Sequence, residues 1–324
     1  MLTKSKEVPF PDFSDIICKE KGGLIMNRFG TTRCGNTEFH WGERTYVMGV
    51  INVSPDSFSG DGISNIEAAA AQAQRFVSEG ADILDIGGES TRPGSTPISI
   101  KEEIKRVVPV VERLASEVNI PLSVDTYKSE VARQAVEVGA TMLNDQWGLK
   151  RDPRLAELAA EKGIPLILMS NQRDKSGYDP RIKSEVSHYD DVITEITSSL
   201  RKSLEMALSL GVPWENLIVD PGIGFGKTWQ QNLEIIQRLE ELNELGRPIL
   251  VGPSRKSFIG IILDLPADER TEGTAASVAI SIAKGADIVR VHDVQQMVRV
   301  CRVSDAIARS ASDRIRMRRP RKAG

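Results

Sequence analysis

Four polar residues of this chain could together bind the edge of a flat heterocycle, and each directly follows a short apolar segment. They are Asp85 after D-I-L, Asp125 after L-S-V, Asn144 after T-M-L and Asp220 after L-I-V. Carboxylates accept hydrogen bonds and an amide both donates and accepts, so the set suits the guanidine-like N–H groups of an aminopyrimidinone. Each Asp taken singly could instead cap the next helix, but four such residues on one face favour a ligand. Asp145, beside Asn144, alternates to the other side of its strand and is predicted to be structural.

A second set of residues is cationic and suits a phosphate-bearing ligand. Arg92 lies in G-G-E-S-T-R-P-G-S, Arg255 and Lys256 lie in S-R-K-S, and Arg290 and His292 lie in R-V-H. Arg290 and His292 are two positions apart on a predicted strand, so their side chains share one side of it. An Arg and a His at the mouth of a pocket suit a diphosphate.

Asn52, which follows Y-V-M-G-V-I, could complete such a site through a hydrated Mg²⁺ ion, the one cofactor that we expect. Two segments rich in Gly, Pro and Ser, residues 54–62 and 87–95, follow the first two apolar segments. Segments of this composition can close over a ligand or form ordinary turns, and both interpretations stay open.

The elements that must position these residues follow a regular rhythm. From Tyr46 onward, eight short apolar segments with polar ends alternate with helix-length amphipathic stretches. This alternation predicts an α/β fold, a TIM (β/α)8 barrel with its active face at the carboxyl ends of the strands. A doubly wound open sheet is the alternative, and polar residues at all eight ends favour closure. Helices are expected at residues 64–79, 99–117, 127–138, 152–162, 188–210, 229–244, 269–284 and 294–311.

Glycines and a short hairpin mark further boundaries. Residues 31–44 predict a hairpin with Gly35 and Asn36 at its turn, which we expect to close the barrel floor. We therefore divide the chain into an N-terminal extension with hairpin (1–44), a barrel domain (45–312) and a basic tail (313–324), expected to be a solvated terminus. Six expected helices end at a glycine, the residue favoured at a left-handed helix terminus: Gly80, Gly139, Gly163, Gly211, Gly246 and Gly285.

Composition limits the classes of partner. The 324 residues carry 42 basic and 45 acidic side chains, so nothing global indicates nucleic acid or membrane. Cys18, Cys34 and Cys301 are odd in number and lack C-x-x-C spacing, which favours a reducing compartment and hence the cytoplasm. We find no apolar run of the roughly 18 residues that a membrane span needs and no secretory signal.

Three motif-like strings are excluded. D-P-G-I-G-F-G-K-T, residues 220–228, resembles a phosphate-binding loop, but Pro221 stands where that motif needs glycine and Asp220 would repel phosphate. Lys227 stands at the third glycine position of a dinucleotide fingerprint, and G-P-S-R-K lacks the last glycine of a nucleophile elbow. A histidine-rich metal site is not expected, because the three histidines are far apart: His40, His188 and His292.

The chain resembles the dihydropteroate synthases through seven strings that occur in order. These are M-G-V-I-N-V-S-P-D-S-F-S, D-I-G-G-E-S-T-R-P-G, S-V-D-T, N-D, D-P-G-I-G-F-G-K, V-G-P-S-R-K-S and R-V-H-D-V. The resemblance runs from about Tyr46 to Ile307. It implies a TIM barrel and a transferase of folate biosynthesis. That enzyme condenses 6-hydroxymethyl-7,8-dihydropterin diphosphate with 4-aminobenzoate to give 7,8-dihydropteroate and pyrophosphate.

The resemblance also implies roles at the pterin diphosphate. Lys256, Arg290 and His292 would be the catalytic residues. Lys256 would bind the pterin carbonyl or a ring nitrogen, Arg290 would stack on the ring while touching the diphosphate, and His292 with Asn52 would hold the diphosphate and Mg²⁺. The pterin edge would be bound by Asp125, Asn144 and Asp220, with Asp85 and Phe225 also at the substrate.

By the same resemblance, Phe58, Pro93 and Ser257 would form the slot for 4-aminobenzoate, and Thr91 and Arg92 would help to close it. The leaving diphosphate would depart in a dissociative, SN1-like step once Mg²⁺ and cations take up its charge, so no protein nucleophile is expected. The work of the protein would be positioning and exclusion of water. We also expect a homodimer, with Ala275, Ala276 and Ala279 at its contact or packed on the barrel.

Three residues depart from the family pattern. Gln146 and Trp147 stand where an apolar residue and an arginine are common, and Ser170 stands where a histidine is usual. A paralogue that binds a pterin without making dihydropteroate therefore remains an alternative. So does a pterin-dependent methyltransferase acting on a corrinoid protein, and so does a non-catalytic binding module.

Overall fold

The computed structural model describes residues 29–53, 62–90, 96–173 and 191–309. Eight of the apolar segments form the strands of one parallel sheet. These strands are β3 (Tyr46–Asn52), β4 (Ile83–Gly87), β5 (Leu122–Asp125), β6 (Met142–Asp145), β7 (Leu166–Met169), β8 (Leu217–Asp220), β9 (Leu250–Val251) and β10 (Ile288–Val291).

The sheet closes on itself. Its strands lie in the order β8-β7-β6-β5-β4-β3-β10-β9, and β8 also pairs with the residue before β9 through a parallel bridge between Val219 and Ile249. A doubly wound sheet would instead have two edge strands and a reversal of strand order. The predicted TIM barrel is therefore confirmed, and the open-sheet alternative is excluded.

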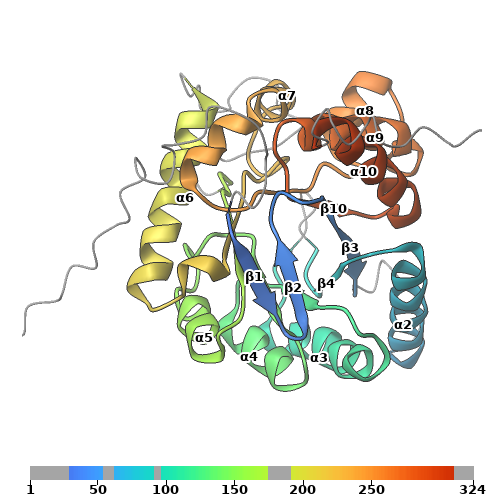
Figure 1. The fold of residues 1–324 in the computed structure, drawn as a ribbon. Coiled ribbons are helices and arrows are strands. Elements are labelled where there is room, and N and C mark those ends of the chain that lie inside the picture. The colour runs from blue at the N-terminus through green and yellow to red at the C-terminus, as the bar shows by residue number, and fades with distance from the viewer. Residues whose placement is uncertain (1–28, 54–61, 91–95, 174–190, 310–324) are drawn as a thin grey trace, which may run out of the picture.

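Helices surround the barrel as a ring (Figure 1). Each of the eight predicted stretches overlaps one of them, and the six predicted glycines all have positive φ. The helices are α2 (Gly62–Glu79), α3 (Ile100–Glu117), α4 (Ser129–Glu137), α5 (Arg154–Lys162), α6 (Val192–Ser209), α7 (Trp229–Gln237), α8 (Ser257–Leu263), α9 (Thr271–Ala283) and α10 (Val294–Ala308), with 3-10 turns at Trp214–Asn216, Leu239–Leu245 and Ala267–Glu269.

One predicted helix is shorter than expected, and one helix was not predicted. The stretch 229–244 is α-helical only to Gln237 and continues as a 3-10 turn, and α8 was not predicted at all. The α8 sequence S-F-I-G-I-I-L lacks polar alternation, so its periodicity could not identify a helix. None of the described helices is long and apolar enough to cross a membrane.

The predicted hairpin is present and lies across the barrel floor (Figure 1). Its strands β1 (Thr31–Cys34) and β2 (Thr37–His40) pair so that Cys34 faces Thr37 across the turn. Beyond β2, the Trp41 ring meets the Tyr46 ring edge-on at 5.5 Å and donates from Nε1 to Oγ1 of Thr32 at 2.8 Å. The residues before 29 and the tail 313–324 lie outside the described part of the chain, so the domain boundaries stay predictions.

The barrel interior changes from apolar to polar along the strands. Residues two positions apart on a strand share one side. Ile83, Met142, Ile218 and Ile288 join the floor cluster beneath the hairpin, while the residues two positions later are Asp85, Asn144, Asp220 and Arg290. This switch places the polar side chains in one layer toward the carboxyl ends of the strands.

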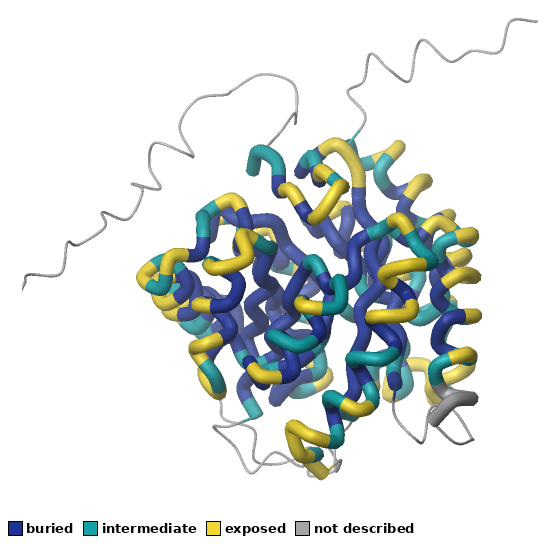
Figure 2. Tube along the Cα trace, turned by 90° about the horizontal axis from the view of Figure 1, so that it is seen from below, coloured by how far each residue is buried: buried dark blue, intermediate teal, exposed yellow. Residues whose placement is uncertain are grey.

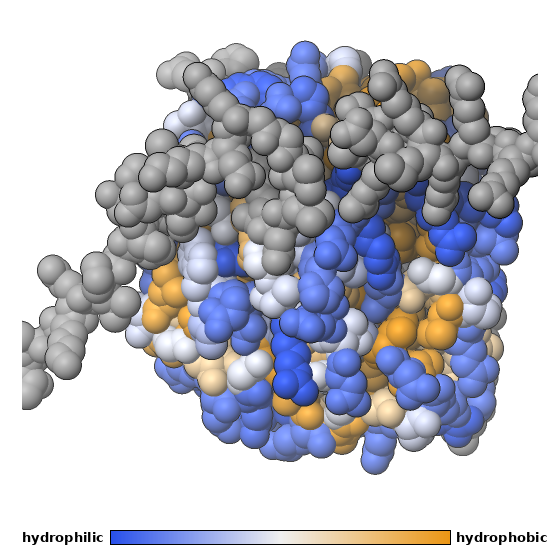
Figure 3. Space-filling view, in the orientation of Figure 1, coloured by the Kyte–Doolittle hydropathy of each residue, from blue (hydrophilic) through white to orange (hydrophobic). Residues whose placement is uncertain are grey.

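The larger apolar clusters lie between the barrel and its helices, where strand residues such as Val124 and Leu168 are fully buried. Buried residues accordingly concentrate in the strands and on the inner faces of the helices (Figure 2). Where the face that carries the hairpin is not covered by grey atoms, it shows hydrophilic and hydrophobic residues intermixed (Figure 3). The hydrophobic effect thus fixes the frame on which the polar layer stands.

Candidate active site

Arg290 joins the predicted acidic and cationic residues at one end of the barrel. Its Nε donates to Oδ2 of Asp85 at 2.6 Å, and its Nη2 donates to Oδ2 of Asp125 at 2.9 Å. Asn144 donates from Nδ2 to the same Asp85 oxygen at 3.1 Å. Three of the four predicted heterocycle-binding residues are therefore linked by hydrogen bonds, Asn144 directly to Asp85 and Asp125 through Arg290, across strands β4, β5, β6 and β10.

Three buried oxygens in this layer accept no hydrogen bond within the described part of the chain. They are Oδ1 of Asp85, Oδ1 of Asp125 and Oγ of Ser123. A buried acceptor without a partner is costly, so these atoms are available for a ligand that brings N–H groups. Ser123 was not predicted, although its position two residues before Asp125 could have indicated it.

Burial raises the pKa of Asp125 to about 7, and Asp85 contributes to the rise while the Arg290 guanidinium opposes it. Burial alone would lower the pKa of Arg290, but Asp85 and Asp125 outweigh it and raise that pKa. Arg290 therefore stays charged, and its charge is shared by two carboxylates.

Asp220 is the last residue of β8, and the loop that follows it packs against the loop after β7. Oδ1 of Asp220 accepts from the amide of Gly222 at 2.7 Å, and burial raises the pKa of this carboxyl to about 6. Lys227 donates from Nζ to the carbonyls of Ser170, Gly222 and Phe225 at 2.7, 3.0 and 3.2 Å. Nζ of Lys227 thus makes three hydrogen bonds to backbone carbonyls of its own and the neighbouring loop. This agrees with the rejection of a phosphate-binding loop here.

Lys256 and Phe225 lie together beside Asp220. Nζ of Lys256 is 4.3 Å from the centroid of the Phe225 ring, and the Arg173 guanidinium carbon is 4.4 Å from that centroid. Burial lowers the pKa of Lys256 to about 8, Arg290 and Arg173 lower it as well, and Asp220 opposes them. Arg173 was not predicted as a site residue, because only the folded loop after β7 brings it to Phe225.

His292 follows β10, and the structure corrects its predicted charge. Its Nδ1 lies 2.9 Å from Oγ of Ser254, and Oγ also accepts the His292 backbone N–H at 3.2 Å. Burial, followed by Arg290, Arg255 and Lys256, lowers the pKa of His292 to about 3. The imidazole is therefore neutral near pH 7, and it can offer Nε2 as a hydrogen-bonding group.

The structure also corrects the place of Arg255 in the cationic set. Arg255 has a φ of 57° and donates from Nε and Nη2 to Asp293 at 3.1 and 2.5 Å, so its charge is balanced. Arg270 donates from Nη1 to the carbonyls of Arg255 and Lys256 at 3.0 and 3.3 Å. These contacts hold the turn that presents Lys256.

The remaining predicted residues divide into two groups. Asn52 ends β3 directly opposite Gly87, and Ser257 is the exposed first residue of α8. The others lie outside the described residues: Phe58, Thr91, Arg92 and Pro93.

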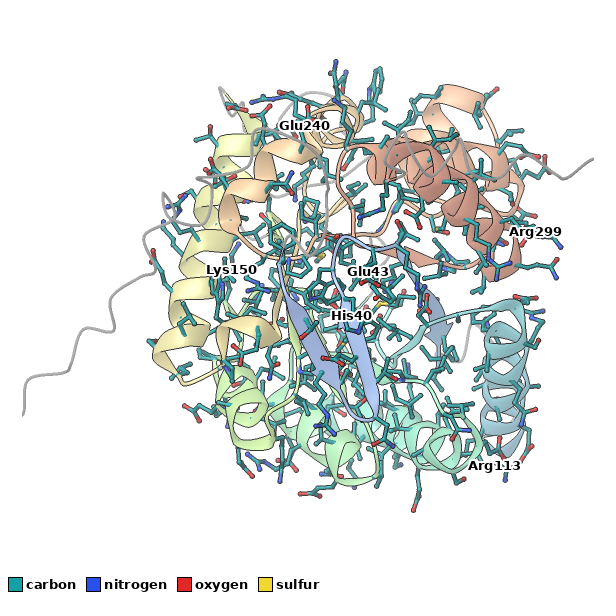
Figure 4. All side chains as sticks on the ribbon, in the orientation of Figure 1. His40, Glu43, Arg113, Lys150, Glu240 and Arg299 are labelled. Carbon is teal, nitrogen blue, oxygen red and sulfur yellow. The ribbon has the colours of Figure 1, made fainter. Side chains whose placement is uncertain are left out.

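Asn52 is the predicted contact to Mg²⁺, and the described residues hold no group of three His, Cys, Asp or Glu side chains that could bind a metal ion by themselves. An amide oxygen is a hard ligand, and Mg²⁺ is commonly held by few protein groups together with substrate phosphates and water. The donor set therefore fits a Mg²⁺ ion that arrives with a diphosphate. His40, in contrast, belongs to the hairpin on the opposite side of the barrel (Figure 4).

The residues that depart from the family pattern make contacts within and between the loops after β5, β6 and β7. Oγ of Ser170 accepts from Nε2 of Gln172 at 3.2 Å, and Asn171 donates from Nδ2 to the carbonyl of Gln146 at 3.0 Å. The Trp147 ring meets the Tyr127 ring edge-on, with 6.3 Å between centroids. The Asn171–Gln146 contact joins the loops after β6 and β7, and the Trp147–Tyr127 contact joins the loops after β5 and β6.

Asp145 has the structural role predicted for it. Its two carboxylate oxygens accept the backbone N–H groups of Trp147 and Leu149 at 2.8 and 2.6 Å. Burial raises the pKa of this carboxyl to about 6, while the backbone hydrogen bonds oppose the rise. The side chain thus folds the loop after β6.

Comparison with known proteins agrees with this geometry. The pterin binding enzyme family matches residues 48–292. The dihydropteroate synthase of Bacillus subtilis is 47% identical over 266 residues, which cover 82% of this chain and 89% of that protein.

Two crystal structures are similar in both sequence and fold. A Clostridium difficile dihydropteroate synthase, solved in the presence of pteroic acid, has a TM-score of 0.78 at 44% identity, covering 84% of this chain and 100% of the other. A Xanthomonas albilineans dihydropteroate synthase with 4-aminobenzoic acid has a TM-score of 0.78 at 39% identity, covering 87% and 99%. The chain therefore belongs to the dihydropteroate synthases, transferases within the pterin binding enzyme family.

Proposed function

We propose that the chain condenses 6-hydroxymethyl-7,8-dihydropterin diphosphate with 4-aminobenzoate to give 7,8-dihydropteroate and pyrophosphate. The observation that carries the proposal is the double contact of Arg290 with Asp85 and Asp125, because it joins the acidic residues to the cationic ones. The similar structures with pteroic acid and with 4-aminobenzoic acid support the same pair of substrates.

In this proposal the acidic residues bind the pterin. Asp125, Asn144 and Asp220 bind its guanidine-like edge, and the unpartnered oxygens of Asp85 and Asp125 supply further acceptors. Lys256 binds the pterin carbonyl or a ring nitrogen from its place beside Phe225. Phe225 itself offers an apolar surface to the substrate.

The cationic residues bind the diphosphate. Arg290 contacts both halves of the substrate, and His292 acts as a neutral hydrogen-bond donor because its pKa is low. Asn52 would hold Mg²⁺ through its amide oxygen together with the diphosphate oxygens, to which His292 donates from Nε2. When bound, Mg²⁺ neutralises charge on the leaving group.

The chemical step follows from these positions. The bond between the pterin methylene and the diphosphate oxygen breaks first, and its electron pair leaves with the diphosphate, whose charge Arg290 stabilises. Conjugation into the ring stabilises the methylene cation. The amine of 4-aminobenzoate then forms the new C–N bond and releases a proton. By the family resemblance, Phe58, Pro93 and Ser257 would form the slot that orients this amine, and Thr91 and Arg92 would help to close it.

A coupled turnover assay tests the proposal. Mixing the protein with both substrates and Mg²⁺ is expected to release pyrophosphate and dihydropteroate in equal amounts, and chelation of Mg²⁺ is expected to stop both until the ion is restored. Pterin binding without pyrophosphate release would instead indicate the non-catalytic alternatives. Methyl transfer from methyltetrahydrofolate to a corrinoid protein would indicate the methyltransferase.

We also propose a cytoplasmic homodimer. The buried free thiols of Cys34 and Cys301 suit a reducing compartment.

The proposed dimer contact lies on α8 and α9. Ile261 and Ile262 of α8 and Ile280 of α9 are each more than half exposed, which offers an apolar surface near three small residues of α9: Ala275, Ala276 and Ala279. Sedimentation equilibrium should show a dimer, and Ile262→Glu should shift it to monomer.

A further inference from the structure

The loop that follows β4 lies directly on helix α3. A Cβ atom at Gly88 would be 2.7 Å from Cγ2 of Val107 and 3.0 Å from Cγ of Glu103, both on α3. Arg106 of the same helix donates from Nη1 to the carbonyl of Gly88 at 3.1 Å. The start of this loop is therefore fixed to α3, with no room for a side chain at Gly88.

Lys128, from the loop after β5, reaches both described ends of the segment 89–98. Its Nζ donates to Oε2 of Glu89 at 2.6 Å, to the carbonyl of Ile98 at 2.8 Å and to Oε2 of Glu103 at 2.6 Å. Glu89 also accepts the backbone N–H of Ile98 at 3.0 Å. One ammonium and one carboxylate thus hold together two residues nine positions apart in the chain.

The cluster of Lys128, Glu89 and Glu103 is buried, and every donor of its ammonium group is hydrogen-bonded. The side chains of Lys128, Glu89 and Glu103 are 10%, 11% and 1% exposed. All three N–H donors of the ammonium have partners, which fixes its direction. Burial opposes the charge of Lys128, but the hydrogen bonds to Glu103 and Glu89 outweigh it and raise the pKa of Lys128, so the cation is retained.

We propose that Lys128 is a positioning residue for the second substrate. It fastens Glu89 and Ile98 to α3 and to the loop that follows Asp125, and so fixes both ends of the segment that contains Thr91, Arg92 and Pro93. The inference rests on the proposed function, in which these three residues contribute to the 4-aminobenzoate slot. Lys128 acts through this segment and touches no substrate.

Steady-state kinetics of Lys128→Met and Glu89→Gln test the inference. In Lys128→Met the KM for 4-aminobenzoate is expected to rise about tenfold or more, while the Kd for pterin diphosphate stays within about twofold of the parent. Glu89→Gln should change KM in the same direction by less, and it keeps the buried pair of Lys128 with Glu103. Hydrogen exchange at the Ile98 amide should be faster in both variants.

Arg113→Met is the matched control, because Arg113 lies on the outer side of α3 and pairs there with Glu117 (Figure 4). It should leave KM and the Ile98 exchange unchanged. Parent values of both quantities in folded Lys128→Met and Glu89→Gln, or equal loss of affinity for the two substrates, would overturn the inference. Failure of the parent protein to release pyrophosphate would refute the proposed function instead, while exchange at Ile98 would still test the anchor.

Discussion

Individual side chains of the site carry charges that balance one another, so single substitutions should have effects far beyond one lost hydrogen bond. Arg290 is shared by two carboxylates, one of which, Asp85, is fully buried. Burial and the like charge of Arg290 lower the pKa of Lys256, and Asp220 is the carboxylate that opposes this most. Function at this scale depends on which of these groups keeps its charge at a given pH.

Replacement of Arg290 by Met should damage both stability and turnover. It leaves Asp85 and Asp125 without their cation, which should lower the free energy of unfolding by about 3 kcal/mol, and it should reduce kcat by about 100-fold or more through loss of charge stabilisation. Urea unfolding and pyrophosphate release measure the two effects.

Arg44→Met serves as the control, because Arg44 makes a two-point pair with Asp82 at the opposite end of β4 and its side chain is 51% exposed. Because Arg44 is half exposed and water can replace its contact with Asp82, the pair should be worth about 1 kcal/mol. Equal effects of the two substitutions would contradict the role given to Arg290.

The charge of Lys256 predicts an alkaline limb in substrate binding. Its pKa is lowered to about 8, so the amine is a cation below that pH and becomes neutral above it. Affinity for pterin diphosphate should therefore fall as pH rises past 8, by up to about tenfold per unit if the charge is essential. Lys256→Arg should bind more weakly overall but without this limb, since a guanidinium stays charged. An identical alkaline limb in both proteins would assign it to another group.

Loops and turns set the geometry of the site at the scale of elements. The loop after β8 carries Asp220 and Phe225 and is held against the loop after β7 by Lys227. Gly226 has a φ of 72°, and a Cβ atom there would lie 2.5 Å from the carbonyl carbon of Gln172. Only glycine satisfies both the backbone angle and the close approach.

Gly226→Ala should therefore cost more than an ordinary glycine replacement in the left-handed region. The expected loss in the free energy of unfolding is about 3 kcal/mol, with weaker pterin binding because Phe225 must shift. Gly163→Ala is the control. Gly163 has a φ of 63°, but a Cβ atom added there would meet no other atom within 4 Å. The substitution should therefore lower the free energy of unfolding by only about 1 kcal/mol. Similar losses in the two variants would show that the close approach has no consequence.

Most of the elements could be predicted because each repeat of the barrel has the same pattern. An apolar strand, a polar end and an amphipathic helix follow one another, and the alternation from Ile83 to Asp85 or from Ile288 to Arg290 already orders the interior. Helix α8 was missed because its apolar run has no helical period. The pairing of Arg255 with Asp293, the contact of Ser254 with His292 and the place of Arg173 could not be predicted. They depend on distances between loops that only tertiary packing sets.

At the scale of the whole molecule, the two ends of the barrel have separate tasks. The floor is filled by the hairpin and an apolar cluster, and the opposite end carries the charged residues. The floor cluster consists of apolar side chains, whereas the site residues contact one another through hydrogen bonds and charges. A substitution in the floor should therefore lower the free energy of unfolding without changing ligand affinity.

Trp41→Ala tests this separation. Trp41 is fully buried beneath the barrel, so truncation should lower the free energy of unfolding by about 3–5 kcal/mol. The Kd for pterin diphosphate, measured below the unfolding transition, should not change. Trp229, which is 38% exposed at the start of α7, provides the control and should cost less than about 1 kcal/mol as Trp229→Ala. A large loss of pterin affinity in Trp41→Ala would show that the two ends are coupled.

The central claim is that the acidic and cationic residues bind opposite halves of one molecule. Calorimetric titration tests it directly. The parent protein, Asp220→Asn and His292→Ala are each titrated with three ligands: 6-hydroxymethyl-7,8-dihydropterin (the pterin alcohol, which lacks the diphosphate), pyrophosphate, and pterin diphosphate. The account predicts that Asp220→Asn loses the alcohol but keeps pyrophosphate, that His292→Ala does the reverse, and that both lose the tight binding of pterin diphosphate. Parent-like affinity for pterin diphosphate in either variant, or binding of pyrophosphate that pterin diphosphate does not displace, would contradict it.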